Sequence, residues 1–180
     1  NILKQFIFIV IITCLVEGEF MQMEDVYRID QGIERYMTKT QKKTADFMEG
    51  CMELGGLLGG WSESEIVELK KYGHALGMAF QITDDIMDYR ETTETTGKPV
   101  GNDLREGLLT YPLLSIVNDN NKDKLLEDIK ALNNGGDEQA IIDYVIGQGG
   151  IDNTLAVADQ YCKDALAALD AVRDFPGKEF

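Results

Sequence analysis

Most of the chain has the periodicity of amphipathic helices, with apolar residues recurring three and four positions apart. Asp30 is placed to cap a long helix that runs through Tyr36, Phe47 and Leu54 and ends in the glycine cluster 55–60. No segment alternates between apolar and polar positions as a half-buried strand does. The pattern therefore predicts an all-α protein.

Ser62 and Glu65 form the S-x-x-E pattern of a capping box, which predicts that a second long helix begins here. This helix continues through the acidic residues at 84, 85 and 88. A polar, glycine-containing loop is predicted over 91–107, followed by helices over 111–117, 122–132, 137–146 and 151–172. Since no repeat or long linker interrupts the pattern, we expect residues 1–180 to form a single domain.

The apolar run at residues 6–12, with Lys4 before it, resembles a signal peptide, but no A-x-A-like cleavage site follows. Seven apolar residues are also too few to cross a bilayer. We therefore expect no membrane span. The run is interpreted as a fully buried helix or as a subunit interface.

Acidic residues outnumber basic ones, 32 against 17, which gives a formal net charge of −15. This charge argues against a nucleic-acid partner and against docking on an anionic membrane. The three cysteines, Cys14, Cys51 and Cys162, form no CxxC pair, so reduced thiols and a cytoplasmic location are expected. The single histidine, His74, excludes a His-rich metal site and is expected to be structural.

Four polar residues form a stripe on the second long helix, at positions i, i+3, i+4 and i+7. They are Gln81, Asp84, Asp85 and Asp88. Placing like charges one turn apart is costly unless a cation offsets them. Hard oxygen ligands favour Mg²⁺, which commonly bridges to phosphate groups. The alternative is a solvated acidic face, but the stripe lies within a largely apolar helix, so a metal–diphosphate site is favoured.

Two lysines are candidates to bind the same anion. Lys98 lies in the loop after the aspartates, among glycines, where it can complete a diphosphate site. Lys43 lies on the preceding long helix next to Thr44, whose hydroxyl can turn inward. The pattern alone equally allows residues 41–43 to be an ordinary solvated patch.

Taken together, these motifs resemble the trans-isoprenyl diphosphate synthases, and the resemblance extends over essentially the whole chain. The matching segments, in order, are Gly18-Glu19-x-x-Gln22, Lys43-Thr44-Ala45, Phe80-Gln81-x-x-Asp84-Asp85-x-x-Asp88, GKPVGNDLREG from Gly97 and Thr110-Tyr111-Pro112-Leu113-Leu114. The resemblance implies an isoprenoid-synthase-type helical bundle around a central cavity. It also implies a prenyltransferase that condenses an allylic diphosphate with isopentenyl diphosphate.

The resemblance further implies a role for each candidate residue. Asp84, Asp85 and Asp88 correspond to the second aspartate-rich motif and would bind Mg²⁺, with Asp84 the expected direct ligand. The catalytic and substrate-binding assignments are Lys43, Thr44, Gln81 and Lys98. Lys43 and Lys98 would neutralise the leaving diphosphate. Thr44 and Gln81 would direct oxygens at the developing carbocation, which is electrostatic catalysis with metal assistance.

The chain also departs from the family pattern. The first aspartate-rich motif, the Gly-Gly-Lys-x-x-Arg segment before it and the paired arginines after it are absent from the 180 residues. Residues 175–180 resemble the lead-in to a final helix, so truncation is expected at both ends. Leu108 stands where many members have lysine, and Tyr111 replaces a common leucine.

Two hypotheses remain open. The chain is part of a prenyl diphosphate synthase and is inactive alone, or it is a non-catalytic truncated or partner subunit that binds diphosphate or dimerises without turnover. A terpene cyclase is disfavoured, because cyclases usually carry an Asn/Ser/Glu metal motif at this place. In the family, the helix before Gly-Glu-x-x-Gln packs near the dimer interface, so a homodimer is expected.

Overall fold

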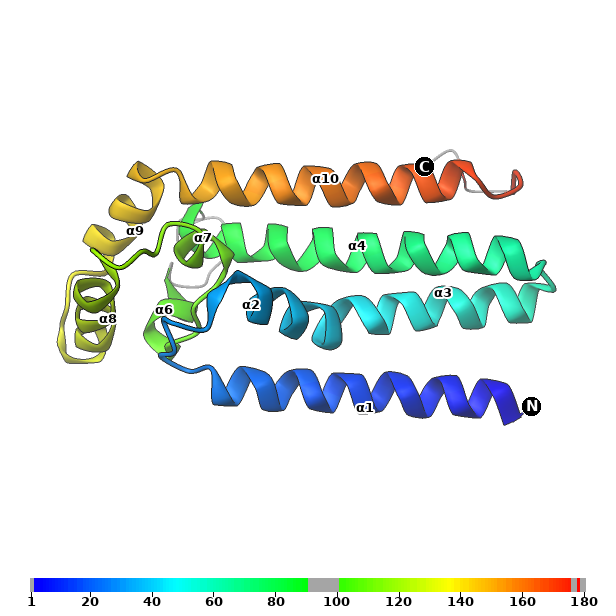
Figure 1. Cartoon of the computed structure of the whole chain (residues 1–180), viewed down its shortest axis with the longest axis horizontal. Coiled ribbons are helices and arrows are strands. Elements are labelled where there is room, and N and C mark those ends of the chain that lie inside the picture. Colours follow the sequence, from blue (N-terminus) through cyan, green and yellow to red (C-terminus); the bar gives the residue numbers. More distant parts are fainter. Residues whose placement is uncertain (1, 91–100, 176–177, 179–180) are drawn as a thin grey trace. The chain divides into compact units, whose positions relative to one another are not determined.

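The computed structural model describes residues 2–90, 101–175 and 178, and all of its regular elements in these ranges are helical. The all-α prediction is therefore confirmed. The elements (Figure 1) are α1 (Ile2–Glu24), α2 (Gly32–Thr40), the π-helix η1 (Gln41–Ala45), α3 (Asp46–Gly59), α4 (Glu63–Arg90), α6 (Asn102–Glu106), α7 (Tyr111–Leu114), α8 (Lys122–Ala131), the 3₁₀-helix η2 (Leu132–Asn134), α9 (Glu138–Gly147) and α10 (Gly150–Asp170).

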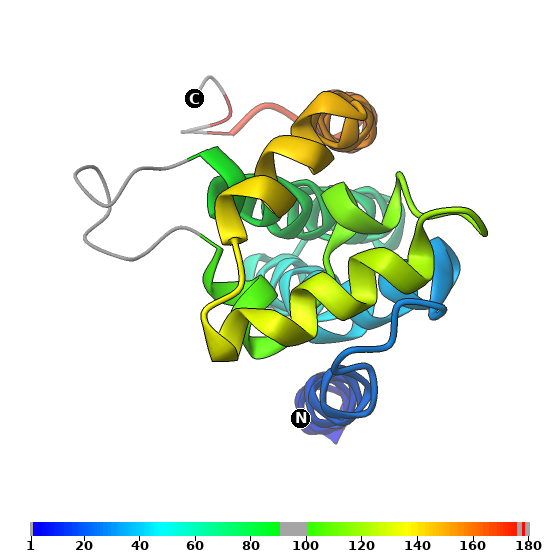
Figure 2. The same ribbon diagram turned by 90° about the vertical axis from the view of Figure 1, so that its left-hand side faces the viewer.

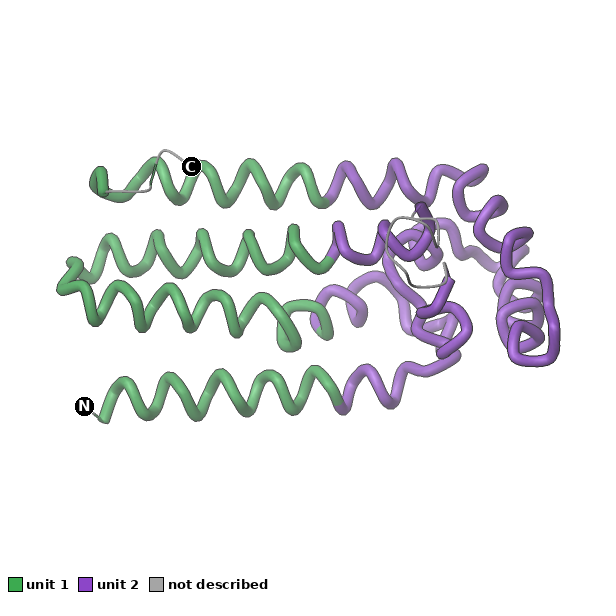
Figure 3. The backbone as a smooth tube through the Cα atoms, turned by 180° about the vertical axis from the view of Figure 1, so that it is seen from behind, with its two compact units in different colours: residues 1–19, 39–81, 158–180 green, residues 20–38, 82–157 purple. Residues whose placement is uncertain are grey.

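The chain divides into two compact units (Figure 3). Unit 1 comprises residues 1–19, 39–81 and 158–180, and unit 2 comprises residues 20–38 and 82–157. In unit 1, the long segments of α1, α3, α4 and α10 lie side by side. Its buried apolar side chains come from α1, η1, α4, α10 and the segment just after α10, while the buried positions of α3 are glycines: Ile7, Ile11, Ala45, Ile66, Leu69, Ala75, Met78, Ala79, Ala158, Ala165, Ala168 and Val172.

Glycines bring the helices of unit 1 into close contact. A Cβ at Gly77 of α4 would lie 2.6 Å from the Cα of Ala45, and one at Gly73 would lie 2.7 Å from the carbonyl oxygen of Met48. On the other side of α3, Gly50 accommodates the side chain of Ile11 from α1. Because these positions have no side chain, α3 can pack almost backbone to backbone against α4.

The turn between α3 and α4 follows the predicted pattern. Gly60 ends α3 with φ at 69°, a conformation that glycine adopts without a Cβ penalty. The backbone N–H of Ser62 donates to Glu65 at 3.0 Å, and the N–H of Glu65 faces the Ser62 hydroxyl oxygen at 3.4 Å. The capping box is therefore confirmed. Arg173, after α10, also forms an ion pair with Glu65.

Unit 2 contains the C-terminal turns of α4 and the short helices that follow, where α8 contacts both α6 and α9 (Figure 2). The prediction that residues 91–107 form a loop is wrong for the last part of this range, where Asn102–Glu106 forms α6. The core of unit 2 includes buried residues from α4, α6, α7, α8, α9, the start of α10 and the segment after α7: Ile82, Ile86, Leu104, Leu113, Ile116, Leu125, Ile129, Ile141, Ile142, Val145 and Ile151.

Helix α1 differs from its prediction in two ways. Only Ile7, Ile11 and Gly18 are buried along its length, so the prediction of a fully buried helix is wrong. The helix also spans 23 residues, because the apolar run 6–12 is only part of it. By length and composition it could therefore cross a membrane, which corrects the argument from length, although helices of soluble proteins and signal sequences pass the same test.

Candidate functional site

The three aspartates of α4 lie in unit 2 and have three different environments. Asp84 is exposed, Asp85 is buried and Asp88 is half-buried. The helical spacing that brings them together in sequence therefore does not make them equivalent. Asp84 is the carboxylate most open to solvent, and thus to an arriving ion.

A tyrosine of α2 forms a hydrogen bond with the Asp85 carboxylate. The Tyr36 hydroxyl of α2 donates to Asp85 Oδ2 at 2.5 Å, and both side chains are buried. The Tyr36 ring also packs edge-on against Tyr111, with the ring centroids 5.6 Å apart. A charged acceptor strengthens such a hydrogen bond, which fixes the orientation of the Asp85 carboxylate.

Asp88 holds the start of α6 against α4. Its carboxylate accepts the backbone N–H groups of Asn102 at 3.0 Å and Asp103 at 3.1 Å. Its own carbonyl accepts the N–H of Gly101. Burial raises the pKa of Asp88, and the backbone N–H groups act in the opposite direction by favouring the carboxylate. Asp88 thus fixes the start of α6, and Lys98 lies outside the described residues.

Lys43, Thr44 and Gln81 lie in unit 1. The Thr44 hydroxyl donates to Gln81 Oε1 at 2.9 Å, and Lys43 Nζ lies 3.1 Å from Glu19 Oε1. The structure therefore brings Thr44 to Gln81 and links Lys43 to the Gly18-Glu19 motif. On the continuous helix α4, Gln81 precedes Asp84 and Asp85 by about one turn.

A π-helical turn positions Lys43 and Thr44. Residues Gln41–Ala45 form η1 between α2 and α3. Such turns are rare and frequently occur at functional sites. Gly18 faces this turn so closely that a Cβ there would lie 2.7 Å from the backbone nitrogen of Lys43, while Gly77 faces Ala45 from α4. The two glycines thus allow α1 and α4 to enclose the turn.

The sequence pattern predicts no role for two residues of this arrangement. Tyr36 belongs to the helical pattern, although a tyrosine at an otherwise apolar position signals a need for a polar partner. Glu19 belongs to the Gly18-Glu19-x-x-Gln22 motif, which does not reveal its contact with Lys43. The π-helical turn has no local sequence signal.

The donors fit a hard divalent cation. The stripe on α4 offers carboxylate oxygens, which Mg²⁺ prefers, and Asp84 leaves room for the waters that Mg²⁺ usually retains. Asp85 is buried against Tyr36 and Asp88 accepts backbone N–H groups of α6, so Asp84 is the most accessible of the three carboxylates. These residues could therefore hold one side of a metal site.

The helical arrangement defines an all-α protein of the isoprenoid-synthase type, and solved structures agree. A decaprenyl diphosphate synthase from Rhodobacter capsulatus is similar with a TM-score of 0.88 and 27% identity, covering 99% of this chain and 56% of that one. A polyprenyl synthase from Caulobacter crescentus CB15, solved with calcium and isoprenyl diphosphate, gives 0.87 and 29%, with the same coverage.

Residues 5–147 match the family model for polyprenyl synthetase, so the chain belongs to this family. It is 34% identical over 155 residues to heptaprenyl diphosphate synthase component 2 of Geobacillus stearothermophilus, covering 86% of this chain and 48% of the relative. It is 32% identical to the octaprenyl diphosphate synthase of Escherichia coli, covering 93% of this chain and 53% of that protein. The chain thus spans about half the length of these relatives.

Proposed function

We propose that this chain is part of a prenyltransferase that condenses an allylic diphosphate with isopentenyl diphosphate to give a longer polyprenyl diphosphate. The observation that carries the proposal is the exposed carboxylate of Asp84 on α4, flanked by two aspartates whose hydrogen bonds fix them in place. The family match spans this helix, and relatives are named as heptaprenyl and octaprenyl diphosphate synthases.

In this proposal the aspartates of α4 hold Mg²⁺ on the allylic diphosphate. The ion, when bound, would neutralise charge on the leaving group. Asp84 is the direct ligand, Asp85 is oriented by Tyr36, and Asp88 holds the start of α6 against α4. This assignment gives the three carboxylates different roles, which the different environments support.

The roles at the leaving diphosphate and at the developing carbocation are assigned to Lys43, Thr44 and Gln81. Lys43, held by Glu19, supplies positive charge to the leaving diphosphate, together with Lys98. The Thr44 hydroxyl donates its hydrogen to Gln81 Oε1, so the lone pairs of the hydroxyl oxygen face other groups. An oxygen presented in this way stabilises a developing carbocation by electrostatic preorganisation.

The 180-residue chain alone is proposed to lack synthase activity, because only one of the family's two aspartate-rich motifs is present. An assay with labelled isopentenyl diphosphate and farnesyl diphosphate should give no longer prenyl product. Joining the chain to the N-terminal half of the related octaprenyl diphosphate synthase should give product, and the same chimera carrying Asp84→Ala should not. Turnover by the isolated chain would contradict the inactivity, and an active Asp84→Ala chimera would contradict the function.

A non-catalytic partner subunit is the second candidate. A relative is named as component 2 of its synthase, and the chain spans about half of that relative. Reading the gene upstream of Asn1 distinguishes the candidates. An in-frame aspartate-rich motif supports the synthase, while a start codon adjacent to Asn1 supports the partner subunit.

We further propose a homodimer in the cytoplasm, with α1 at the subunit interface. Large apolar side chains are exposed along this helix, among them Phe6, Phe8 and Phe20. An exposed apolar surface of this extent is typical of an interaction site. Recovery of the protein in the membrane fraction after alkaline carbonate extraction would contradict the cytoplasmic location and favour insertion of α1 into lipid.

A further inference from the structure

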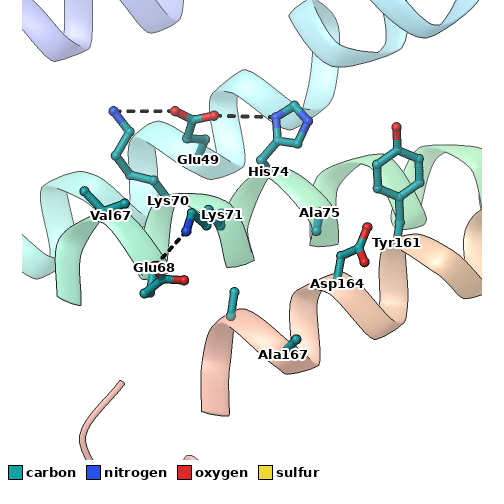
Figure 4. Close-up of a pocket in the computed structure, with 11 residues that line it drawn as sticks. Glu49, Val67, Glu68, Lys70, Lys71, His74, Ala75, Tyr161, Asp164 and Ala167 are labelled. Atoms are coloured by element: carbon teal, nitrogen blue, oxygen red, sulfur yellow. Dashed lines mark hydrogen bonds and ion pairs between the residues drawn. The ribbon is translucent and has the colours of Figure 1, made fainter. Parts of the chain in front are cut away.

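A second group of potential metal ligands lies in unit 1, apart from the aspartates of α4. Asp46 and Glu49 come from the first turn of α3, and His74, the single histidine, comes from α4. One ligand atom from each residue lies within 4.8 Å of the other two. His74 Nδ1 and Glu49 Oε2 are 3.5 Å apart (Figure 4).

These separations suit a small ion. In a tetrahedral site with bonds of about 2.1 Å, neighbouring ligand atoms are about 3.4 Å apart. The Glu49–His74 pair already has this spacing, and the ligand atom of Asp46 lies within 4.8 Å of both. The three residues also come from two helices that Gly73 and Gly77 hold in close contact, so their backbones are well fixed.

The carboxylates of Asp46 and Glu49 each also contact a residue outside the cluster. The Gln41 amide nitrogen donates to Asp46 Oδ1 at 3.2 Å. Lys70 Nζ lies 3.5 Å from Glu49 Oε1, the oxygen that does not face His74, and 2.9 Å from Glu53. Outer contacts of this kind orient metal ligands and leave the second oxygen for the ion.

The cluster is open to solvent. Glu49 and His74 line a cavity of about 680 Å³, whose other walls include Tyr161 and Asp164 of α10, shown in Figure 4. All three candidate ligands are half-buried. An ion can therefore enter and keep a water as its fourth ligand.

We propose that Asp46, Glu49 and His74 bind Zn²⁺ and thereby link α3 to α4. An imidazole nitrogen with two carboxylates suits Zn²⁺, whereas Mg²⁺ and Ca²⁺ are bound almost entirely by oxygen. This site does not depend on the proposed synthase activity, since none of its residues belongs to the aspartate stripe of α4.

Without the ion, the contact of 3.5 Å between His74 Nδ1 and Glu49 Oε2 keeps two of the ligands together. Glu49 raises the pKa of His74, and the His74 imidazole is the main cause that lowers the pKa of Glu49. Zn²⁺ would compete with a proton for the imidazole nitrogen, because only the neutral ring can coordinate a metal. The Glu49–His74 contact therefore already has the geometry that the metal would use.

The single histidine permits a direct test on the 180-residue chain. Heteronuclear NMR of labelled protein, stripped of metal by chelation, gives one set of imidazole signals. Addition of Zn²⁺ up to one equivalent should shift these signals and halt their titration with pH. Zinc binding that leaves the signals unchanged overturns the proposal, because the ion would then be held elsewhere, for example by the thiols.

Matched variants test the remaining ligands. Glu49→Gln and Asp46→Asn should each weaken the Zn²⁺ affinity, measured from the His74 signals, by more than about tenfold. Tenfold is about the smallest loss seen when only an outer contact of a ligand is removed, so a direct ligand should cost more. Glu68→Gln is the control, because Glu68 lines the same cavity and pairs with Lys71 outside the cluster. Equal effects of Glu68→Gln and Glu49→Gln would contradict the assignment.

Discussion

At the scale of single residues, the aspartates of α4 show how one motif contains different functions. Asp84 is exposed, while Asp85 is buried against Tyr36 and Asp88 accepts two backbone N–H groups. The motif spacing reveals the helix face but not these partners. Substitutions at the three positions should therefore differ in kind as well as in size.

Replacing Asp84 should affect activity more than folding. In the proposed chimera with the N-terminal half of the octaprenyl diphosphate synthase, Asp84→Ala should lower kcat by about 100-fold or more, since a metal contact supplies several kcal/mol of charge stabilisation. Stability should be unchanged or slightly higher, because Asp84 repels its acidic neighbours. Steady-state kinetics and thermal melting of the variant measure both effects.

Thr83→Ala is a suitable control for this substitution, since Thr83 is the exposed neighbour of Asp84 on the same helix. It should change neither kcat nor the melting temperature appreciably. Parallel losses of activity and melting temperature in Asp84→Ala would count against a role in metal binding.

Tyr36→Phe should reveal the support that Asp85 receives. The change removes a buried hydrogen bond to a carboxylate while keeping the ring, so about 1–3 kcal/mol of unfolding free energy should be lost. Asp85→Asn should weaken the same contact. A double-mutant cycle in urea should give a coupling energy of about 0.5–3 kcal/mol, and additive effects would show that the two side chains act independently.

At the scale of elements, α4 connects local sequence signals with the candidate site. Its start is fixed by Ser62 and Glu65, and its path along α3 depends on Gly73 and Gly77. The capping box is a local signal, whereas the packing of the glycines requires a neighbouring helix. A separate prediction follows from each of them.

The capping contacts of Glu65 should make stability depend on pH. Arg173 and then Ser62 hold the pKa of Glu65 well below its usual value of 4.5. A lowered pKa in the folded state adds stability above pH 4.5, which is lost as the pH falls through the folded value. The difference in melting temperature between the native chain and Glu65→Gln should therefore be full at pH 7 and shrink below pH 4.5. A difference that grows on acidification would contradict this assignment.

Gly77 should be far less tolerant of alanine than Gly55. A Cβ at Gly77 would lie 2.6 Å from the Cα of Ala45, so Gly77→Ala should cost about 1–3 kcal/mol through overpacking. Gly55 of α3 has nothing within 4 Å of the same position, so Gly55→Ala should stabilise by about 0.5–1 kcal/mol. Urea denaturation of both variants measures the contrast, and equal effects would show that α4 does not pack as described.

At the scale of the whole molecule, α1 carries large apolar side chains that the described residues leave exposed. Phe6→Glu and Phe8→Glu each place a charge on this surface. If α1 forms a dimer interface, light scattering should give a dimer for the native chain and a monomer for these variants. Lys42→Gln, which breaks an ion pair with Glu17 and leaves the apolar side chains of α1 unchanged, should stay dimeric. A monomeric native chain would contradict the proposed dimer.

The sequence predicted the helices because their signals are local. The capping box at Ser62 and the glycines after α3 act within a few residues, so these boundaries were correctly predicted. The short helix α6 was missed because its start rests on Asp88, fourteen or more residues earlier. Likewise, apolar composition alone could not tell whether α1 would be buried.

The sequence by itself determined the all-α class, the family and the helix that carries the aspartates, since periodicity and motif spacing are properties of the linear chain. Only the tertiary structure decided that Tyr36 orients Asp85, that Thr44 meets Gln81 from a π-helical turn, and that Asp46 and Glu49 approach His74. Each of these contacts joins residues from different helices. Their formation depends on packing distances between helices, which no local pattern of residues encodes.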